Sequence, residues 1–297
     1  MKHSSRIRAF AKINTGLKIL GKRPDRFHEL RTVYQTITLH DDLRLTLATG
    51  RGIEVRCDDP SVPNGRANLA YRACQIWKRL RQYRGGVRIE IRKSIPTGSG
   101  LGGGSSDAAA TLMGLERMMG SKIDQITMFA MAAELGSDVP LFLQGGRVLG
   151  CGRGEEVYPL PDLPRRHCLV IYPRFSISTA DAFRALDLRL TREARPSIIR
   201  GFGVWSQFPM QGWGPAENDF ESFVFAKWPE LGRLKDQLIR AGAEIASLTG
   251  SGSAIYAIFV SARQMKEAAK QTPREWVVLG AQTLSRPAYR RSLFCDD

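Results

Sequence analysis

The chain has 297 residues, of which 43% are hydrophobic and 25% are charged. This composition is typical of a globular protein and excludes a disordered, collagen-like or low-complexity chain. Its apolar runs are far shorter than the roughly 18 to 20 residues that a membrane helix needs, and the first residues lack the apolar stretch of a secretory leader. The length predicts one large or two ordinary domains.

The charge is strongly positive. The net charge is +15, and residues 1–100 alone carry 21 basic and 8 acidic side chains. Such an excess favours anionic ligands, either nucleic acid or phosphorylated small molecules, although a general basic bias of the chain would explain it equally well. The chain has no polybasic tract, zinc-finger spacing or RNA-recognition aromatic pattern, which argues against a nucleic-acid binder.

Cysteine and histidine usage indicates neither disulfides nor a metal centre. The five cysteines are odd in number and none falls in a CxxC pair, so we expect free thiols in a reducing, cytoplasmic compartment. The four histidines are scattered without zinc spacing, so we expect no structural transition metal.

The N-terminal third is predicted to be rich in strands. Residues 6–20 alternate between apolar and polar and predict a strand with Lys12 and Asn14 on one face. A helix is expected from the N-cap residue Asn68 to about Gln82. Further strands are expected at 32–39, 43–47, 53–56 and 87–92.

The rest of the chain is predicted to mix helices and strands. A helix over 124–135 ends at Gly136, and a new helix begins at Asp138, just before Pro140. Residues 189–215 lack periodicity and suggest a long connection. They are followed by a helix at 230–241, a strand-loop-strand unit at 246–260 and a helix at 262–270.

The densest glycine cluster joins the strand at 87–92 to the next helix. Glycines let backbone amides approach an anion, and a helix start directs unpaired N–H groups toward it, so the cluster predicts a phosphate-binding loop. Gly98, Gly100 and Gly103 also fit the dinucleotide motif GxGxxG, but the preceding strand alternates and lacks the continuous apolar run of a Rossmann strand. Residues 16–22 have Walker A spacing but lie in a strand pattern and lack the final Ser or Thr.

Two segments resemble the second and third motifs of the GHMP kinases, which include galactokinase, homoserine kinase, mevalonate kinase and phosphomevalonate kinase. They are PTGSGLGGGSSDAAA and LTGSGSAIYAIF. Two more segments, AKINTGLKILGKRPDRFHEL and GSDVPLF, resemble the members that phosphorylate the 2-hydroxyl of 4-diphosphocytidyl-2-C-methyl-D-erythritol in non-mevalonate isoprenoid biosynthesis. The matches follow the family's order and span residues 9 to about 260.

The resemblance implies an α+β, two-domain GHMP kinase fold. An ATP-binding domain would cover residues 1–160, and a smaller ferredoxin-like domain would cover residues 161–297. It also implies a cytoplasmic, ATP-dependent small-molecule kinase, either a monomer or a homodimer, with no nucleic-acid or membrane partner. Two other functions remain possible on the sequence: a GHMP kinase for a different alcohol, and a non-catalytic binding protein with the same fold.

The resemblance also implies a catalytic pair, Lys12 and Asp138. Asp138 would accept or orient the substrate hydroxyl proton, while Lys12 would keep Asp138 ionised and offset charge on the phosphoryl group. By themselves, Asp138 equally fits a helix N-cap and Lys12 an exposed strand lysine. The residues implied to bind ATP and its Mg²⁺ are Asn68, Lys93, Pro96, Gly98, Gly100, Leu101, Gly102, Gly103, Gly104, Ser105 and Ser106. Alone, Asn68 fits a helix cap and Lys93 a solvated side chain.

The acceptor would be a cytidine diphosphate-linked polyol. The residues implied to bind it are Asn14, Phe27, His28, Asp138, Thr179 and Phe183. Phe27 and Phe183 would sandwich the cytosine and His28 would hydrogen-bond its edge, although two core phenylalanines are an alternative. The family pattern Gly-Tyr-His is Arg26-Phe27-His28 here, so Arg26 would either reach the acceptor diphosphate or point to solvent. The loop 249–253 would support the phosphate loop or touch the acceptor, and a simple hairpin turn is the alternative.

Overall fold

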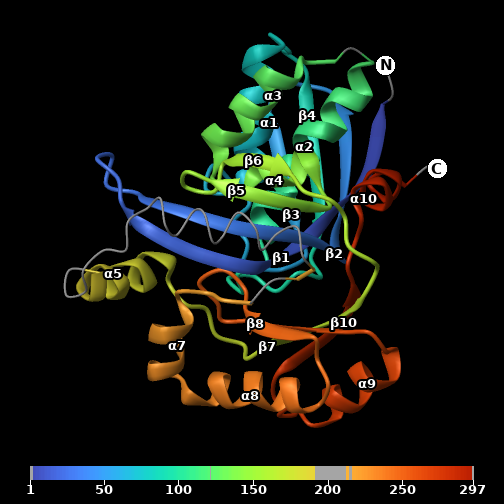
Figure 1. Cartoon of the computed structure of the whole chain (residues 1–297). Helices are drawn as coiled ribbons and strands as arrows, with labels where there is room; N and C mark the ends of the chain where they lie inside the picture. The colour runs from blue at the N-terminus through green and yellow to red at the C-terminus, as the bar shows by residue number, and fades with distance from the viewer. Residues whose placement is uncertain (1–2, 121, 191–211, 214–215, 296–297) are drawn as a thin grey trace.

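The computed structural model describes residues 3–120, 122–190, 212–213 and 216–295. These residues form two β-sheets that lie against each other, with helices on their outer sides (Figure 1). Within the described ranges, no helix has both the length and the apolar character needed to cross a bilayer. Most of the predicted connection at 189–215 lies outside the described residues.

The first sheet has six strands and is mostly antiparallel. Its strands are β1 (Ser4–Lys22), β2 (His28–Ala48), β3 (Ile53–Cys57), β4 (Gly86–Arg92), β5 (Arg147–Cys151) and β6 (Glu156–Pro159). They run in the order β3-β4-β2-β5-β6, β1 pairs with β2, and β3 and β4 are parallel. The helices of this unit are α1 (Leu69–Leu80), α2 (Gly103–Met119), α3 (Gln125–Leu135) and α4 (Val139–Gln144). The sheet is not a Rossmann sheet, as the alternating strand before the glycine cluster predicted.

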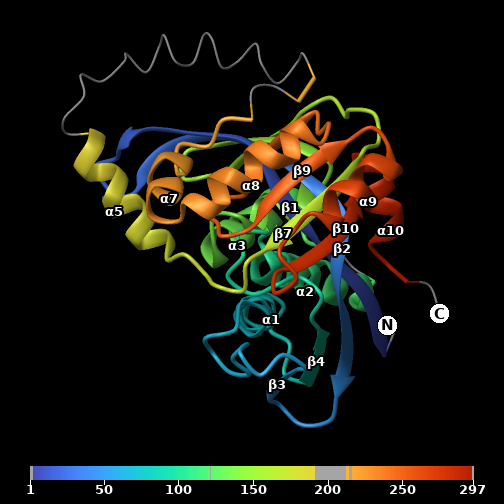
Figure 2. The same ribbon diagram turned by 90° about the horizontal axis from the view of Figure 1, so that it is seen from below.

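The second sheet has four antiparallel strands. They are β7 (His167–Tyr172), β8 (Ile245–Leu248), β9 (Ile255–Phe259) and β10 (Val277–Gln282), in the order β10-β7-β9-β8. The helices of this part of the chain are α5 (Thr179–Leu190), α7 (Glu221–Lys227), α8 (Pro229–Arg240) and α9 (Ala262–Lys270). Viewed from below, α8 and α9 lie across the outer face of the sheet (Figure 2). The strand order is that of a ferredoxin-like unit, and the predicted α+β fold class is confirmed.

The C-terminal segment of the chain packs on the first unit, although the sequence predicted it to belong to the second. The predicted domain boundary at residue 160 stays a prediction. Helix α10 (Arg286–Ser292) carries Tyr289 into the hydrophobic core of the first unit. A separate cluster joins the two sheets, with Ile13 and Ile37 from the first and Val170 and Tyr256 from the second. The last residues of the chain therefore contribute to the first core, while the two sheets share a buried interface.

The predicted strands at 32–39 and 43–47 are a single strand, β2. Residues 40–42, which separate the two predicted strands, belong to it. Asp41 is fully buried because Lys93 and two backbone amides bind its carboxylate. The predicted helices from Asn68, at 124–135, at 230–241 and at 262–270 match α1, α3, α8 and α9 to within a few residues.

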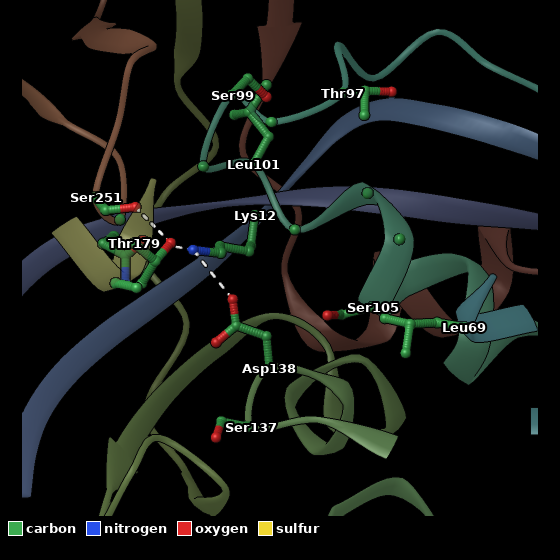
Figure 3. Close-up of a pocket in the computed structure, with 18 of the residues that line it drawn as sticks. Lys12, Leu69, Thr97, Ser99, Leu101, Ser105, Ser137, Asp138, Thr179 and Ser251 are labelled. Atoms are coloured by element: carbon green, nitrogen blue, oxygen red, sulfur yellow. Dashed lines mark hydrogen bonds and ion pairs between the residues drawn. The ribbon is translucent and has the colours of Figure 1, made fainter. Parts of the chain in front are cut away.

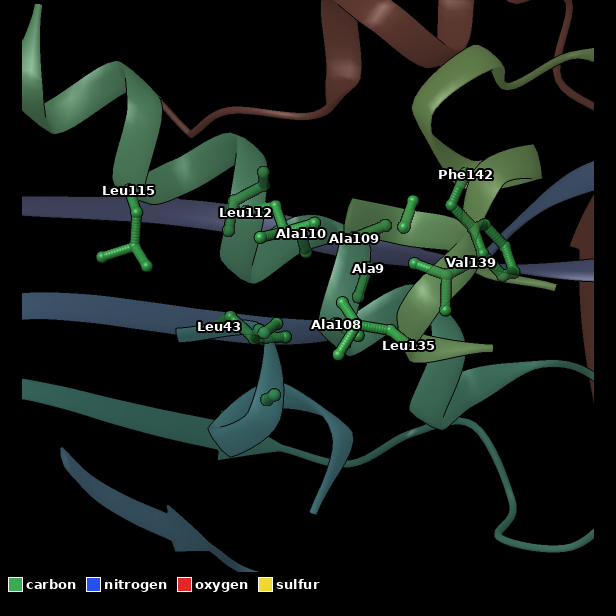
Figure 4. Packing of buried hydrophobic residues seen from close by; sticks show 14 of the residues in the cluster. Ala9, Leu43, Ala108, Ala109, Ala110, Leu112, Leu115, Leu135, Val139 and Phe142 are labelled. Carbon is green, nitrogen blue, oxygen red and sulfur yellow. The ribbon is translucent and has the colours of Figure 1, made fainter. Parts of the chain in front are cut away.

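Helix α2 packs on the first sheet through a buried surface that combines small residues with larger ones such as Leu112 and Leu115 (Figure 4). Ala108, Ala109 and Ala110 are all buried. A Cβ atom at Gly114 would collide with the side chain of Leu45 on β2. Small residues let the helix backbone approach the strands, and this close packing fixes the position of the glycine loop at the helix N-terminus.

Candidate active site

A cavity of about 920 Å³ lies at the junction of the glycine loop, β1, α4 and α5. The predicted site residues on its wall are Lys12, Asn14, Phe27, His28, Asn68, Lys93, Pro96, Gly98, Gly100, Leu101, Gly102, Gly103, Gly104, Ser105, Asp138, Thr179 and Phe183. Ser106 is the exception: it is 1% exposed, and its buried hydroxyl has no hydrogen-bond partner among the described residues. Its place in the first turn of α2 directs this side chain into the protein interior.

The glycine loop has the backbone geometry of an anion site. Gly98, Gly100 and Gly102 have φ values of 69°, 84° and 76°, which L side chains rarely adopt. Gly102 is the N-cap of α2, and no side chain caps the helix there. The first N–H groups of α2 therefore face the cavity without a side-chain acceptor, as an oxyanion site at a helix N-terminus requires.

Lys12 and Asp138 face each other across the cavity (Figure 3). The Lys12 Nζ lies 3.4 Å from Asp138 Oδ2 and donates to Asn14 Oδ1 at 2.7 Å. Lys12 is only 3% exposed, so the alternative of an exposed strand lysine is wrong. Asp138 is the N-cap residue of α4, but its side chain makes no capping hydrogen bond and is about one-third exposed to the cavity. The carboxylate is therefore available to a ligand.

Tyr34 is a second partner of this carboxylate. Its hydroxyl donates to Asp138 Oδ1 at 3.1 Å, and its ring centroid lies 5.5 Å from the Lys12 Nζ. Burial, together with the negative charge of Asp138, raises the Tyr34 pKa well above its usual value. Tyr34 therefore stays protonated and continues to donate to Asp138 at neutral pH.

The loop 249–253 connects the second unit to strand β1 and the glycine loop. The Thr249 hydroxyl lies 3.3 Å from Asn14 Oδ1 and 3.2 Å from the Gly100 carbonyl oxygen. The Asn218 amide holds this loop by donating to the carbonyl oxygens of Leu248 and Gly250 at 2.9 and 2.8 Å. The loop therefore contacts both the glycine loop and Asn14, and its role toward ATP or the acceptor stays a prediction.

Lys93 lies in a buried charge cluster beside the glycine loop. Its Nζ is 2.5 Å from Asp41 Oδ2 and 2.9 Å from Asp107 Oδ2. Asp41 also accepts from the amides of Ser94 and Ile95, whereas Asp107 Oδ1 has no partner among the described residues. Burial raises the pKa of Asp107 to about 7 despite Lys93, because one cation cannot neutralise two buried carboxylates. The alternative of a solvated lysine is wrong.

Asn68 has the structural role that its sequence context suggested. Its Oδ1 accepts from the Ala70 amide at 2.8 Å and caps α1, and its Nδ2 donates to the Pro63 carbonyl oxygen at 2.8 Å. Because Asn68 also lines the cavity, these bonds hold α1 in place against the site.

The other end of the cavity is aromatic. Phe27 is 52% exposed, and its ring centroid lies 4.7 Å from the Arg153 guanidinium. His28 stacks on Phe183 with ring centroids 4.4 Å apart and planes 12° apart. The His28 ring therefore occupies one face of Phe183, and the predicted sandwich of a base by Phe27 and Phe183 stays a prediction. Thr179 contacts Ser251 through their hydroxyls at 2.9 Å (Figure 3).

Several residues of the site were missed in the sequence. Tyr34 sits in a strand pattern where an aromatic residue is ordinary, and Asn218 follows a segment without periodicity. Asp41 was visible only as a break between two strands. The feature that these three residues share is a polar group at a buried position, and burial becomes apparent only once the fold is known.

Comparisons with known proteins identify the family of this chain. Family models for the GHMP kinases N terminal domain and the GHMP kinases C terminal match residues 68–146 and 211–276. A 4-diphosphocytidyl-2-C-methyl-D-erythritol kinase of Solibacter usitatus is 42% identical, over 85% of this chain and 80% of the relative. One of Geobacter sulfurreducens is 35% identical, over 94% and 98% of the two chains. The chain belongs to the 4-diphosphocytidyl-2-C-methyl-D-erythritol kinase family.

Solved structures place the chain in the same group. A crystal structure of 4-(cytidine 5'-diphospho)-2C-methyl-D-erythritol kinase matches with a TM-score of 0.77 and 31% identity, covering 94% of this chain and 98% of that one. The mevalonate kinase of L. major shares the fold at a TM-score of 0.72 and 16% identity, over 96% and 98% of the two chains. The chain is therefore an ATP-dependent kinase of the GHMP superfamily that acts on a small-molecule alcohol.

Proposed function

We propose that this kinase transfers the γ-phosphoryl group of ATP to the 2-hydroxyl of 4-diphosphocytidyl-2-C-methyl-D-erythritol, with Lys12 and Asp138 as its catalytic pair. The observation that carries the proposal is the position of this pair. It lies in one cavity between the glycine loop, suited to phosphates, and the aromatic end with Phe27, suited to a base. ATP and the acceptor would thus approach the pair from opposite ends.

The chemistry follows from the contacts of the pair. In the proposed step the acceptor oxygen forms a bond to the γ-phosphorus, the bond from that phosphorus to the β-γ bridging oxygen breaks, and the hydroxyl proton passes to Asp138. Lys12 and the Tyr34 hydroxyl hold the two carboxylate oxygens of Asp138 in place, so this carboxylate chiefly orients the acceptor hydroxyl. Lys12 and the N-terminus of α2 offset the charge on the transferred group.

We infer that Mg²⁺ accompanies ATP. The Ser105 hydroxyl and the Asp138 carboxylate both lie on the cavity wall, and oxygen donors of this kind are the ligands that Mg²⁺ prefers. The described residues hold no group of three or more metal-ligating side chains, so ATP oxygens and water would complete the coordination. When bound, Mg²⁺ would neutralise charge on the β- and γ-phosphates.

Asp138→Asn tests the catalytic assignment. Turnover should fall by orders of magnitude while ATP affinity stays nearly unchanged, because the substitution removes a charge but little volume. Asp236→Asn, at an exposed position of α8, is the matched control and should behave as wild type. Turnover of the Asp138 variant within about threefold of wild type would refute the assignment.

Competition by CDP tests the acceptor. If the acceptor is linked to cytidine diphosphate, CDP should compete with it and leave ATP binding unaffected. A kinase that CDP does not inhibit would instead act on a different alcohol, the second candidate that the Arg26-Phe27 departures from the family pattern favour.

A further inference from the structure

Arg26 has an unfavourable backbone conformation at the wall of the cavity. Three non-glycine residues among those described have positive φ, namely Arg26 at 68°, Gln82 at 50° and Arg174 at 65°. Of the three, Arg26 alone lines the cavity. The left-handed region is disfavoured for a residue with a Cβ atom, so glycine would fit this position with less strain. A role for the Arg26 side chain would offset this backbone strain.

The loop around Arg26 contains several hydrogen bonds of its own. The Arg23 amide donates to the Phe27 carbonyl oxygen at 2.7 Å, and the Arg26 amide donates to the Arg23 carbonyl oxygen at 3.1 Å. The Asp25 carboxylate accepts from the Phe27 amide at 3.1 Å and from Arg23 Nε at 3.2 Å. These bonds fix the turn between β1 and β2, so Arg26 and Phe27 are held side by side at the acceptor end.

Other cations at this end of the cavity are already engaged. Arg153 donates to Glu155 at 3.1 Å and covers the Phe27 ring, and Arg184 is paired with Asp181. In contrast, the Arg26 side chain makes no hydrogen bond or ion pair with any described residue. Its guanidinium is thus a cation on the cavity wall that is available to a ligand.

We propose that Arg26 binds the diphosphate of the acceptor. The inference rests on the proposed function, in which the glycine loop is occupied by the phosphates of ATP. The acceptor brings two further phosphates, which lie between its base and its polyol. A guanidinium next to the base-binding Phe27 is suited to them, since its planar donors bind phosphate oxygens in pairs. Arg26 is therefore a specificity residue that distinguishes a cytidine diphosphate group from cytidine.

The test compares cytidine and CDP by calorimetry on the full chain. Arg26→Gln keeps a long side chain but removes the charge, and should weaken CDP binding about tenfold while cytidine binding stays within about twofold. Arg26→Gly should show the same loss for CDP together with a higher melting temperature, because the backbone strain is relieved. Arg174→Gln is the matched control, an arginine with positive φ away from the cavity, and should change neither affinity.

The possible outcomes separate this inference from the proposed function. A loss for CDP alone supports Arg26 as the diphosphate ligand. An equal loss of affinity for cytidine and CDP would show that Arg26 acts on the base pocket and does not bind the diphosphate. Unchanged CDP affinity would show that its side chain points to solvent. Either result overturns the inference, while binding of cytidine by the wild-type protein leaves the proposed function standing. Wild-type protein that binds neither ligand would overturn the proposed function and this inference with it.

Discussion

Lys93→Met removes the single cation of the buried cluster that joins β2 to α2. The Lys93 side chain is 7% exposed, and methionine fills most of its volume without the charge. After the substitution Asp41 keeps the amides of Ser94 and Ile95 as donors. Asp107 loses its cation, and its other oxygen already has no partner among the described residues. The cost of the substitution therefore falls mainly on Asp107.

The size of the effect follows from this difference between the two carboxylates. Removing one partner of a buried ion pair costs about 3–5 kcal/mol of the free energy of unfolding. We expect the lower end, about 3 kcal/mol, because Asp41 remains hydrogen-bonded and Asp107 can take up a proton. Asp107→Asn in the Lys93→Met background should recover at least about 1 kcal/mol, since the two side chains are in contact and their effects are not additive.

Urea unfolding at pH 7 without nucleotide measures these free energies. Lys270→Met is the matched control: this exposed lysine pairs with Glu267 one helical turn away, so its loss should cost less than about 0.5 kcal/mol. A Lys93→Met variant within about 1 kcal/mol of wild type would refute the reasoning. So would purely additive effects of Lys93→Met and Asp107→Asn, because they would show that the two groups do not interact.

Three further outcomes are expected. Burial raises the pKa of Asp107 to about 7, above the value of about 3.9 in an unfolded chain, so the native state binds more protons between pH 4 and 7. Stability should fall as pH rises through this window, and Asp107→Asn should remove that slope in unfolding experiments. Tyr34→Phe takes a donor from Asp138 and should lower turnover about tenfold in a steady-state assay, with unchanged ATP affinity. Gly100→Ala should lower the melting temperature strongly, because its Cβ would collide with a backbone oxygen of the facing loop, whereas Gly104→Ala, with its nearest neighbour at 3.8 Å, should not.

The local features of the site could be predicted from the sequence. Alternation along β1 placed Lys12 and Asn14 on one face, and Asn68 is the N-cap of α1 as expected. The glycine cluster does join a strand to a helix. Each of these follows from backbone periodicity, capping or glycine conformation, which are properties of a few consecutive residues.

Contacts between distant segments were decided by the tertiary structure. The spacing of residues along the chain could not show that the Asp138 side chain contacts Lys12 and Tyr34 and leaves α4 uncapped. It also could not show that β2 continues through Asp41. A buried charge is tolerated only where a partner meets it, and that partner comes from another element of the fold. Lys93 is an example. Its local sequence is equally typical of a solvated lysine, whereas the packing of β2 against α2 buries it between Asp41 and Asp107.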